Sequence, residues 1–484
     1  MTVTDYSLTG PSSEQAVARG LANAEWFMPN IDPATLRALQ ARSNRRAAAE
    51  VVLWVVLLVG AGVWAYATAW SWWSIPAFIL YGALYGGAAD ARWHECGHGT
   101  AFRTRWINDV VYYVASFMLF RGPTVWRWSH YRHHTDTIIV GRDAEIVFQR
   151  PTSPGKAVWM FFHIEGGLKM FWRLVQHAFG KLDGDARAFV PESEHRKVVW
   201  ESRVMVAIVA AAAVWSVVAW TPLPILLIGG PSIYGAWLMV FFGITQHAAL
   251  RENTLDHRYS TRTVYMNPVF RFLYLNMNYH VEHHIFPSVP YPALPKLHAE
   301  IKDQLAPPMR NVRSTYAQIF RALAQQKRDP AYEIDLLVPD VPSAPRHRIE
   351  VGETSWVKGH EGRYDLGAAD ALDVGELRRV DVGDRTFVLC RLSADEFALG
   401  DGLCTHAKVH LADGALVDGQ IECPKHNGRF DAHTGEPTRK PPREALCMYP
   451  VRRVAGRLVS DLEPQAGSST TPAESEPAHV LQEH

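Results

Sequence analysis

Two long stretches of the chain contain no charged side chain. The first is the 39 residues 51–89, and the second is the 47 residues 204–250, in which His247 is the only side chain that titrates near neutral pH. One membrane-spanning helix needs about 20 residues at about 1.5 Å each. Each stretch is therefore predicted to form two membrane-spanning helices joined by a tight turn, four helices in all. The alternative is a large soluble helical protein in which both hairpins are buried.

Both predicted turns contain proline, and neither contains Lys or Arg: they are SWWSIP at 71–76 and TPLP at 221–224. Arginines flank the outer ends of the two hairpins instead, namely Arg42, Arg45, Arg46, Arg92, Arg203 and Arg251. By the positive-inside rule, these outer ends face the cytoplasm. A further apolar run, 107–120, has only 14 residues and includes Asp109, so it is predicted to be re-entrant or interfacial.

The pattern changes after Lys327. Residues 328–347 are rich in proline and have no amphipathic period, which is typical of a linker. From 348 to 462, short segments of alternating polarity such as TFVLCRL are separated by glycine and aspartate, which predicts a compact all-β domain. The tail 463–484 is rich in Ser, Thr, Pro and Glu and is predicted to be disordered. With a cytosolic segment 1–46 and a membrane domain 47–327, the chain divides into five parts.

Composition narrows the function classes. The 49 basic and 49 acidic side chains balance, so nothing favours nucleic acid as a partner. Charged residues make up only 20% of the chain and there are 17 tryptophans, which favours a membrane protein with soluble parts. Five widely spaced cysteines do not form a secreted disulfide framework, and the polar N-terminus lacks a signal-peptide pattern. The termini are expected in a reducing cytoplasm.

Three histidine clusters stand out: HECGH, HYRHH and HVEHH. Their spacings of three and four residues place the imidazoles of each cluster on one helix face, and neutral imidazole is a common metal ligand. His247, at the expected cytoplasmic end of the fourth membrane helix, is a further candidate. The nine candidate metal ligands are His94, His98, His130, His133, His134, His247, His280, His283 and His284.

The number of candidates bears on the chemistry. Alone, HECGH matches the H-E-x-x-H motif of zinc proteases, in which Glu95 would act as the base. A zinc protease needs only one further ligand, and a single octahedral metal accepts at most six, so nine histidines indicate two metals. Outside the clusters, a surface or hydrogen-bonded role is expected for His163, His177, His195, His257 and His298. Five carboxylates are candidates for orienting ligands: Glu95, Glu282, Asp136, Asp143 and Glu145.

The three clusters, with RDAEIVF after the second and IFPSVPYPALPKLH after the third, resemble the membrane fatty acid desaturase family over roughly residues 25–325. The resemblance implies an all-α integral membrane fold, with four transmembrane helices plus cytosolic helices, and two iron ions held as a diiron centre by the nine histidines. The chain looks most like bacterial branches that include rhizopine-catabolism oxygenases, some of which work with a Rieske ferredoxin. Such branches act on molecules other than fatty acids. The chain is therefore expected to be a multi-pass protein of a bacterial cytoplasmic membrane.

A second possible metal site lies in the predicted β domain. Cys404 and His406 form C-x-H, and Cys423 and His426 form C-x-x-H, with sixteen residues between the two motifs. Two cysteines and two histidines are compatible with a structural zinc. The pattern, with NGRFDAHTG after the second motif, resembles the Rieske family, which implies a [2Fe-2S] cluster whose irons are held by the two cysteines and the two histidines respectively. Because neither loop carries an additional cysteine, the domain resembles the ferredoxin type. Cys390 and Cys447 are predicted to be packed thiols in strands.

Together the resemblances imply a dioxygen-dependent desaturase or hydroxylase for an unactivated C–H bond of a lipophilic or amphiphilic substrate, such as a fatty acyl chain. A separate NAD(P)H-dependent ferredoxin reductase is expected to reduce the cluster, which passes electrons singly to the diiron centre. The first alternative is a hydroxylase or O-demethylase of a small polar molecule. Others are an intramembrane zinc protease using His94, Glu95 and His98, and a redox-sensing membrane receptor without turnover.

Overall fold

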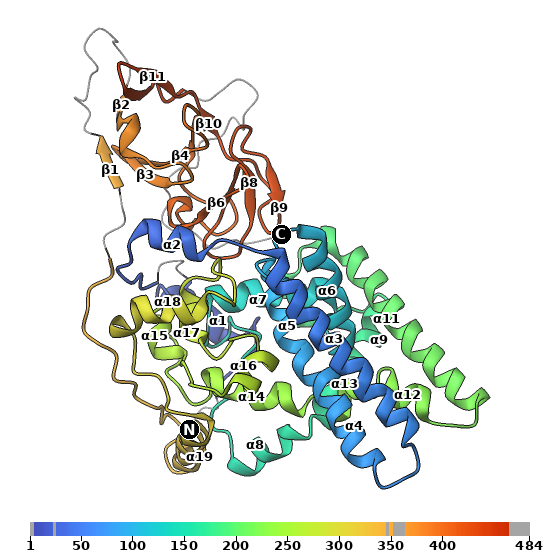
Figure 1. The fold of residues 1–484 in the computed structure, drawn as a ribbon. Helices are drawn as coiled ribbons and strands as arrows, with labels where there is room; N and C mark the ends of the chain where they lie inside the picture. Colours follow the sequence, from blue (N-terminus) through green and yellow to red (C-terminus); the bar gives the residue numbers. More distant parts are fainter. Residues whose placement is uncertain (1–3, 23–25, 345–347, 352–363, 464–484) are drawn as a thin grey trace. The chain divides into compact units, whose positions relative to one another are not determined.

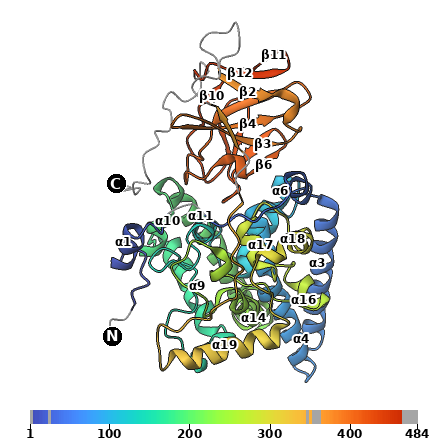
Figure 2. The ribbon, with the colours of Figure 1, turned by 90° about the vertical axis from the view of Figure 1, so that its left-hand side faces the viewer.

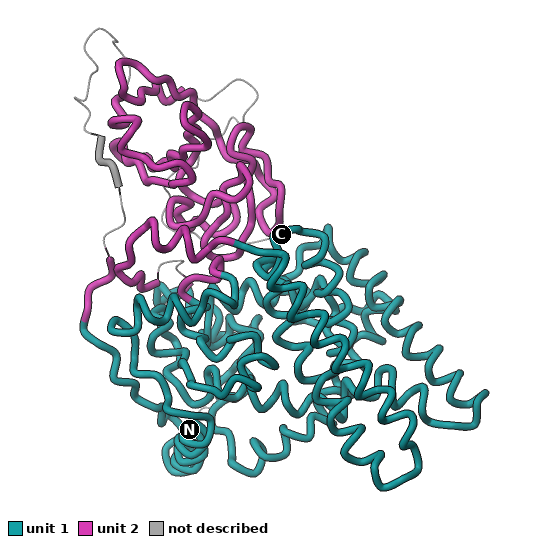
Figure 3. Tube along the Cα trace, viewed as in Figure 1, with its two compact units in different colours: residues 1–21, 42–284, 290–340 teal, residues 22–41, 285–289, 341–484 magenta. Residues whose placement is uncertain are grey.

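The structure is a computed structural model that describes residues 4–22, 26–344, 348–351 (backbone only) and 364–463. Almost all of the tail predicted to be disordered lies outside the described residues. The chain divides into two compact units, drawn in two colours in Figure 3. Unit 1 comprises residues 1–21, 42–284 and 290–340, and unit 2 comprises residues 22–41, 285–289 and 341–484. Part of the predicted linker, up to Asp340, thus groups with unit 1.

Unit 1 contains both predicted hairpins (Figure 1). Helix α3 (Asn44–Ala67) is followed by a turn and then by α4 (Ser74–Gly82), which continues through the π-helical segment η1 (Ala83–Gly87) into α5 (Ala88–His98). The second hairpin begins with α11 (Glu192–Val218). After its turn it is broken into the short helices α12 (Leu223–Leu227), α13 (Pro231–Tyr234) and α14 (Trp237–His247).

The structure does not confirm four membrane-spanning helices. Among the described residues, only α3 and α11 are long and apolar enough to cross a membrane. The second arm of each hairpin is interrupted where the second arms of the two hairpins approach each other. Glycine permits this approach, because a Cβ on Gly235 would overlap the backbone of Gly82. Such small residues permit close backbone approach between helices, but they and the adjacent prolines also interrupt regular α-helix.

The remaining helices of unit 1 pack beside these hairpins. The apolar run around Asp109 forms a single short helix, α6, and α19 runs beside α14 (Figure 2). These elements are α1 (Pro11–Ala18), α6 (Arg105–Met118), α7 (Pro123–Thr135), α8 (Pro154–Phe161), α9 (Ile164–Ala178), α10 (Gly184–Phe189), α15 (His257–Ser260), α16 (Pro268–Leu273), α17 (His280–Ile285), α18 (Leu294–Ile301), the 3-10 helix η2 (Lys302–Gln304) and α19 (Val312–Gln326).

Unit 2 confirms the predicted all-β domain. One sheet has strand order β1-β3-β4-β5-β10, a second β11-β12-β2, and a third β6-β7-β8-β9; pairing is antiparallel except between β1 and β3. Buried apolar side chains from the first two sheets, such as Phe387, Leu399 and Leu458, form its core. The strands are β1 (Arg348–Val351), β2 (Tyr364–Ala368), β3 (Leu377–Val382), β4 (Arg385–Arg391), β5 (Phe397–Asp401), β6 (Ala415–Val417), β7 (Gln420–Glu422), β8 (Arg429–Asp431), β9 (Pro437–Arg439), β10 (Met448–Tyr449), β11 (Arg452–Val454) and β12 (Arg457–Ser460).

Short helices complete unit 2: η3 (Ala369–Ala371), η4 (Leu411–Asp413) and α2 (Pro33–Leu39). Helix α2 comes from the N-terminal part of the chain, which the sequence did not associate with the β domain. Its first turn is capped by Asp32, whose side chain accepts a hydrogen bond from the backbone N–H of Thr35 at 2.8 Å.

Candidate metal centres

The three histidine clusters lie on three helices of unit 1. Helix α5 carries the first cluster in its last turn and ends at Gly99, which adopts the left-handed conformation (φ 66°) that glycine tolerates. Helix α7 carries the second cluster and begins at Pro123, a residue favoured in a first helical turn. Helix α17 carries the third, and His247 is the last residue of α14.

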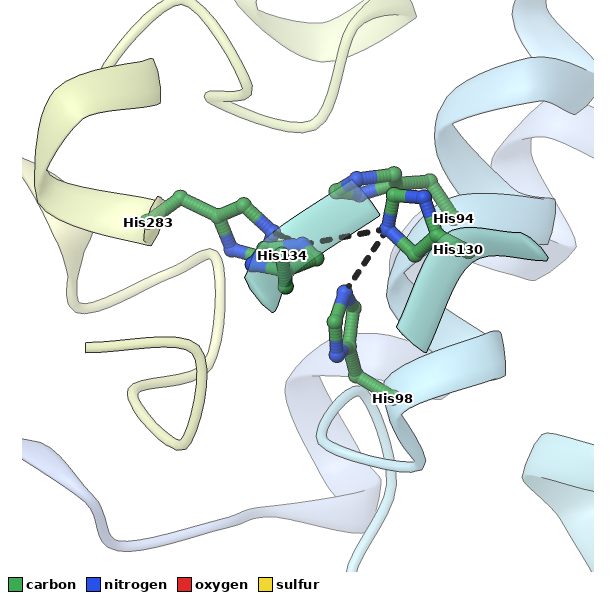
Figure 4. A group of neighbouring side chains, drawn as sticks. All are labelled: His94, His98, His130, His134 and His283. Atoms are coloured by element: carbon green, nitrogen blue, oxygen red, sulfur yellow. Dashed lines mark hydrogen bonds between the residues drawn. The ribbon is translucent and has the colours of Figure 1, made fainter. Parts of the chain in front are cut away.

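Five of the nine candidate histidines form a first group. One ring nitrogen from each lies within 4.8 Å of those of the others, and Figure 4 shows the rings converging from α5, α7 and α17. The Nε2 atoms of His98 and His134 each lie 3.1 Å from Nε2 of His130, and Nε2 of His283 lies 3.2 Å from that of His134. This first group is His94, His98, His130, His134 and His283.

The other four candidates form a second group with the same 4.8 Å limit: His133, His247, His280 and His284. Nε2 of His280 lies 3.0 Å from Nε2 of His247 and 3.2 Å from that of His284. The structure therefore brings all nine histidines together, in two groups. Each group contains residues from more than one helix, so no single sequence motif could have predicted which histidines belong to it.

The chemistry of both groups fits metal ions. Burial and the neighbouring imidazoles together hold the pKa values of His94, His134 and His283 well below the ordinary value, so these rings are neutral. Both ring nitrogens of His94 are buried without a hydrogen-bond partner. Converging neutral imidazole nitrogens suit a transition metal of the kind that imidazole binds, including zinc, copper and iron.

Two carboxylates orient histidines of the second cluster. Asp143 lies 2.9 Å from Nδ1 of His133, and Glu145 lies 3.2 Å from Nδ1 of His130. Burial alone would lower the pKa of His133, but the Asp143 carboxylate raises it to about 9. A carboxylate bound to one ring nitrogen fixes the tautomer and leaves the other nitrogen for a metal.

The other three candidate carboxylates serve different partners. Glu95 accepts hydrogen bonds from the Thr100 hydroxyl (2.7 Å) and the Tyr291 backbone N–H (3.2 Å). Glu282 binds His298 at 2.5 Å, and Asp136 binds Arg142. The hydrogen bonds of Glu95 are to Thr100 and Tyr291 and not to a candidate histidine, so these contacts do not support a zinc-protease base.

Two contacts that orient candidate histidines could not be predicted from the sequence. The Thr137 hydroxyl lies 3.1 Å from Nδ1 of His284, and the backbone carbonyl of Ser260 lies 2.9 Å from Nδ1 of His247. Thr137 follows the second cluster by three residues, whereas Ser260 is separated from His247 by a loop. A threonine or a carbonyl is too common to be singled out without the fold.

The five histidines of unit 1 for which a surface or hydrogen-bonded role is expected mostly behave so. His177 bonds to Asp183, His195 to the carbonyl of Val190, and His298 to Glu282. The ring of His257 packs near that of His284, with a centroid distance of 5.4 Å. His163 differs, because it is buried and its Nε2 has no hydrogen-bond partner.

In unit 2, the two Cys/His motifs occupy neighbouring loops. Cys404 and His406 follow β5, and Cys423 and His426 lie between β7 and β8. The imidazole centroids of His406 and His426 are 5.0 Å apart, and a hydrogen bond from Cys423 lowers the pKa of the Cys404 thiol. Burial, with the positive charges of Arg443 and Lys425, lowers the pKa of His406 to about 4.

The two histidines differ in exposure: His426 is only 2% exposed, whereas His406 is partly exposed. The remaining cysteines are packed thiols, as predicted. Cys390 lies in β4, and Cys447 lies just before β10 rather than within a strand; both are buried and neither forms a disulfide.

A cavity of about 480 Å³ lies against both histidine groups. Its walls include His94 and His130 from the first group and His133, His247 and His280 from the second. Much of the remaining wall is apolar, with side chains from α8, α9 and α14. A molecule in this cavity would lie beside whatever metals the histidines hold.

The cavity wall also contains a buried ion pair. Arg121 binds Asp90 at 2.5 Å, and its guanidinium lies over the rings of Trp93 (4.2 Å) and Trp126 (4.8 Å). Burying a charged pair gives little net stability, so its presence at the cavity is consistent with a role in binding.

The family model for fatty acid desaturases matches residues 70–316, just over half of the chain. This chain belongs to the fatty acid desaturase family. A model for the Rieske [2Fe-2S] domain matches residues 362–450, which include both Cys/His motifs. The desaturase domain and the Rieske domain together make the protein an oxygen-dependent, iron-containing oxidoreductase with a fused electron carrier.

Known relatives match the two parts separately. The Rieske part is 35% identical over 95 residues to the anthranilate 1,2-dioxygenase ferredoxin subunit of Burkholderia cepacia, covering 20% of this chain and 87% of that protein. The chain is also 33% identical over 124 residues to the sn-1 oleoyl-lipid 12-desaturase of Anabaena variabilis, covering 25% of this chain and 35% of that enzyme.

Among solved structures, the ferredoxin of carbazole 1,9a-dioxygenase from Nocardioides aromaticivorans IC177 matches 20% of this chain and 95% of its own length. The identity is 30% and the TM-score is 0.19.

Proposed function

We propose that the chain is a dioxygen-dependent desaturase or hydroxylase that attacks an unactivated C–H bond of a lipophilic or amphiphilic substrate, such as a fatty acyl chain. The observation that carries this proposal is the largely apolar cavity that reaches both histidine groups. Such a cavity can hold an alkyl segment against the metals while the protein fixes which carbon is presented. The fused Rieske domain supplies the electrons.

We assign the nine histidines to two iron ions, one per group. The first group would hold one iron through His94, His98, His130, His134 and His283, and the second group the other through His133, His247, His280 and His284. When bound, the irons supply the redox chemistry by which dioxygen oxidises a C–H bond. Zinc is redox-inert and would have no use for a tethered electron carrier, which favours iron.

The residues around the histidines prepare them for this task. Asp143 and Glu145 hold the protons of His133 and His130 at Nδ1, which leaves Nε2 of each ring for a metal; at His133 the metal would displace the second proton. The Ser260 carbonyl does the same for His247. These contacts fix ring orientation before any metal binds.

In the Rieske domain, Cys404 and Cys423 would hold one iron of the [2Fe-2S] cluster, and His406 and His426 the other. A separate NAD(P)H-dependent reductase would reduce the cluster one electron at a time. Desaturation takes two hydrogens from the substrate and, with two electrons and two protons, converts dioxygen to two waters. Hydroxylation leaves one oxygen atom in the product and releases the other as water.

We further propose a multi-pass protein of the cytoplasmic membrane, with the histidine groups and the Rieske domain on the cytoplasmic side. The support is the pair of long apolar helices α3 and α11 and the arginines that flank both hairpins. The bilayer would then be the source of a lipophilic substrate.

A second candidate is hydroxylation or O-demethylation of a small polar molecule. The Asp90–Arg121 pair in the cavity wall favours it, because a charged pair stacked on two tryptophans can bind a hydroxyl or amine group as well as a lipid head group. The cavity volume of about 480 Å³ accommodates either class.

The deciding experiment uses the purified full chain with a bacterial ferredoxin reductase, NADH and isotopically labelled dioxygen. Fatty acyl lipids and small polyols or methoxylated compounds are supplied in parallel. Substrate-dependent dioxygen uptake with an unlabelled alkene supports desaturation, and a labelled alcohol supports hydroxylation. The proposal would be contradicted if no candidate substrate stimulated dioxygen uptake and the histidines held zinc and no iron. The receptor or protease alternative would then be favoured.

A further inference from the structure

An N-terminal segment of the chain is part of the Rieske unit. The backbone of Met28 forms two hydrogen bonds with the predicted linker that precedes the β domain: its N–H donates to the Ser343 hydroxyl (3.0 Å), and its carbonyl accepts from the Ala344 N–H (2.8 Å). Arg37 on α2 binds Asp373 at 2.8 Å and lies 3.9 Å from Glu376. Residues 26–41, called here the N-terminal clasp, are therefore attached at two separate places.

The clasp also reaches the cluster loop. The ring of Trp26 lies 4.5 Å from Nζ of Lys425, which is the residue between Pro424 and His426 in the loop CPKH. Trp26 is 8% exposed and Lys425 only 3% exposed. Lysine is almost never buried so completely unless its charge has a partner. A cation over a tryptophan face is attracted by the ring quadrupole, and the attraction is stronger in a desolvated site than in an exposed one.

The position of this charge matters because reduction changes the charge of the cluster. The cluster accepts one electron from the reductase, no bond forms or breaks, and the reduced cluster is more negative by one charge. A buried positive charge beside the cluster stabilises the reduced state, since Coulomb interactions are weakly screened away from water. Net charge, hydrogen bonds and exposure are the factors that set the potentials of such clusters.

We propose that the N-terminal clasp tunes the Rieske cluster: Trp26 is a positioning residue that holds the Lys425 ammonium in the cluster loop, and this charge raises the reduction potential. The inference depends on the proposed function only in that Cys404, His406, Cys423 and His426 hold the cluster. It gives a structural reason for the association of the clasp with the β domain rather than with the membrane part of the chain.

The test is a redox titration of the full-length protein in detergent, followed by the electron paramagnetic resonance signal of the reduced cluster. At the potential where half of the wild-type cluster is reduced, we expect Lys425→Met to lower the ratio of reduced to oxidised cluster about tenfold. Trp26→Ala should lower it in the same direction by about threefold. Lys425→Arg and Trp26→Phe keep the charge and the aromatic face, so they should titrate close to wild type.

A double variant separates positioning from a merely structural role. If Trp26 acts through Lys425, Trp26→Ala adds nothing further in a Lys425→Met background. Trp72→Ala, which changes an exposed tryptophan of unit 1, serves as the matched control and should not move the potential.

Unchanged potentials in Lys425→Met and Trp26→Ala would overturn the inference and leave the cluster assignment intact. Loss of the cluster from both Trp26 variants, with Lys425→Met titrating as wild type, would also overturn it, because Trp26 would then only maintain the fold. Absence of a Rieske-type signal from the wild-type protein would instead contradict the proposed function.

Discussion

Nε2 of His134 lies 3.2 Å from Nε2 of His283, although 149 positions separate the two residues in the chain. The pair joins the second histidine cluster on α7 to the third on α17. Two neutral imidazoles with their nitrogen lone pairs at this distance repel each other unless a proton or a metal ion lies between them. The contact therefore needs either a shared proton or a bound metal ion between the two rings.

Replacing a member of this pair should remove iron selectively. We expect the wild-type protein to contain two irons beyond those that accompany the acid-labile sulfide of the cluster. His134→Ala should lose iron from the first group and keep its sulfide content, because His134 belongs to unit 1 and the two Cys/His loops belong to unit 2. Metal and sulfide analysis after anaerobic purification measures both.

The control is His195→Gln, since His195 bonds only a backbone carbonyl among the contacts seen. It should retain full iron. Equal iron content in His134→Ala and wild type would contradict the ligand assignment.

Asp143 should govern iron affinity through His133. Its Oδ2 lies 2.9 Å from Nδ1 of His133 and also accepts the Ile138 N–H at 2.8 Å. Asp143→Asn removes the charge that fixes the ring tautomer, so we expect iron affinity to fall about 10–100-fold. Competition with an iron chelator measures the change. Glu282→Gln, which alters a buried carboxylate bound to His298 instead, should leave the affinity near wild type.

Gly243 provides a way to fill the cavity without disturbing the fold. It lies in α14 at the cavity wall, and a Cβ added there would meet no atom within 4 Å. Gly243→Leu should therefore occupy substrate space, and replacing a helical glycine removes a cost of roughly 1 kcal/mol. We expect turnover of the accepted substrate to fall at least about tenfold, with iron content unchanged.

Gly60→Leu is the matched control, because Gly60 is also a helical glycine with open space but lies on α3, away from the cavity. It should keep full activity. Equal loss of activity in both variants would show that the cavity does not hold the substrate.

Glu95 should make the stability of the folded protein depend on pH, and it should not take part in catalysis. Burial raises the pKa of this carboxyl to about 7, above its ordinary value of 4.5. The folded state therefore holds its proton more tightly than the unfolded state. Its stabilising contribution is present below pH 4.5 and is lost as the pH rises to about 7, a loss of roughly 3 kcal/mol.

Glu95→Gln removes this titration and keeps an oxygen acceptor for Thr100 and Tyr291. Between pH 5 and pH 7, we expect the wild-type Tm to fall relative to that of the variant, while the iron content and turnover of the variant stay near wild type. Loss of turnover with unchanged Tm would place Glu95 in the chemistry instead.

Cysteine labelling can test the membrane topology. All five native cysteines are buried, so an impermeant reagent should react with introduced cysteines only. Ser71→Cys and Thr221→Cys lie in the two hairpin turns, and Asp384→Cys lies in an exposed turn of the Rieske domain. A membrane-impermeant maleimide added to intact cells should label the two turns. It should label residue 384 only after the membrane is opened. Labelling of one turn alone would show that only one hairpin crosses the membrane.

The sequence by itself was sufficient for everything that depends on local spacing. Histidines three and four positions apart share a helix face whatever the fold, so the nine candidates could be named in advance. The alternating short segments predicted the β domain, and the C-x-H and C-x-x-H motifs predicted its two loops. Long uncharged runs predicted the hairpins, although glycines and prolines interrupt their second arms, and among the described residues only α3 and α11 are long apolar helices.

Only the tertiary structure decided how the histidines are divided. His133 belongs to one group while its neighbours His130 and His134 belong to the other, and His283 is separated from His280 and His284 in the same way. Residues three and four apart share a face but still point about 60° or 40° to either side of it. How α5, α7, α14 and α17 cross determines which side each ring joins. The clasp that brings Trp26 to Lys425 was equally invisible, because a contact between residues 399 positions apart leaves no periodic trace in the chain.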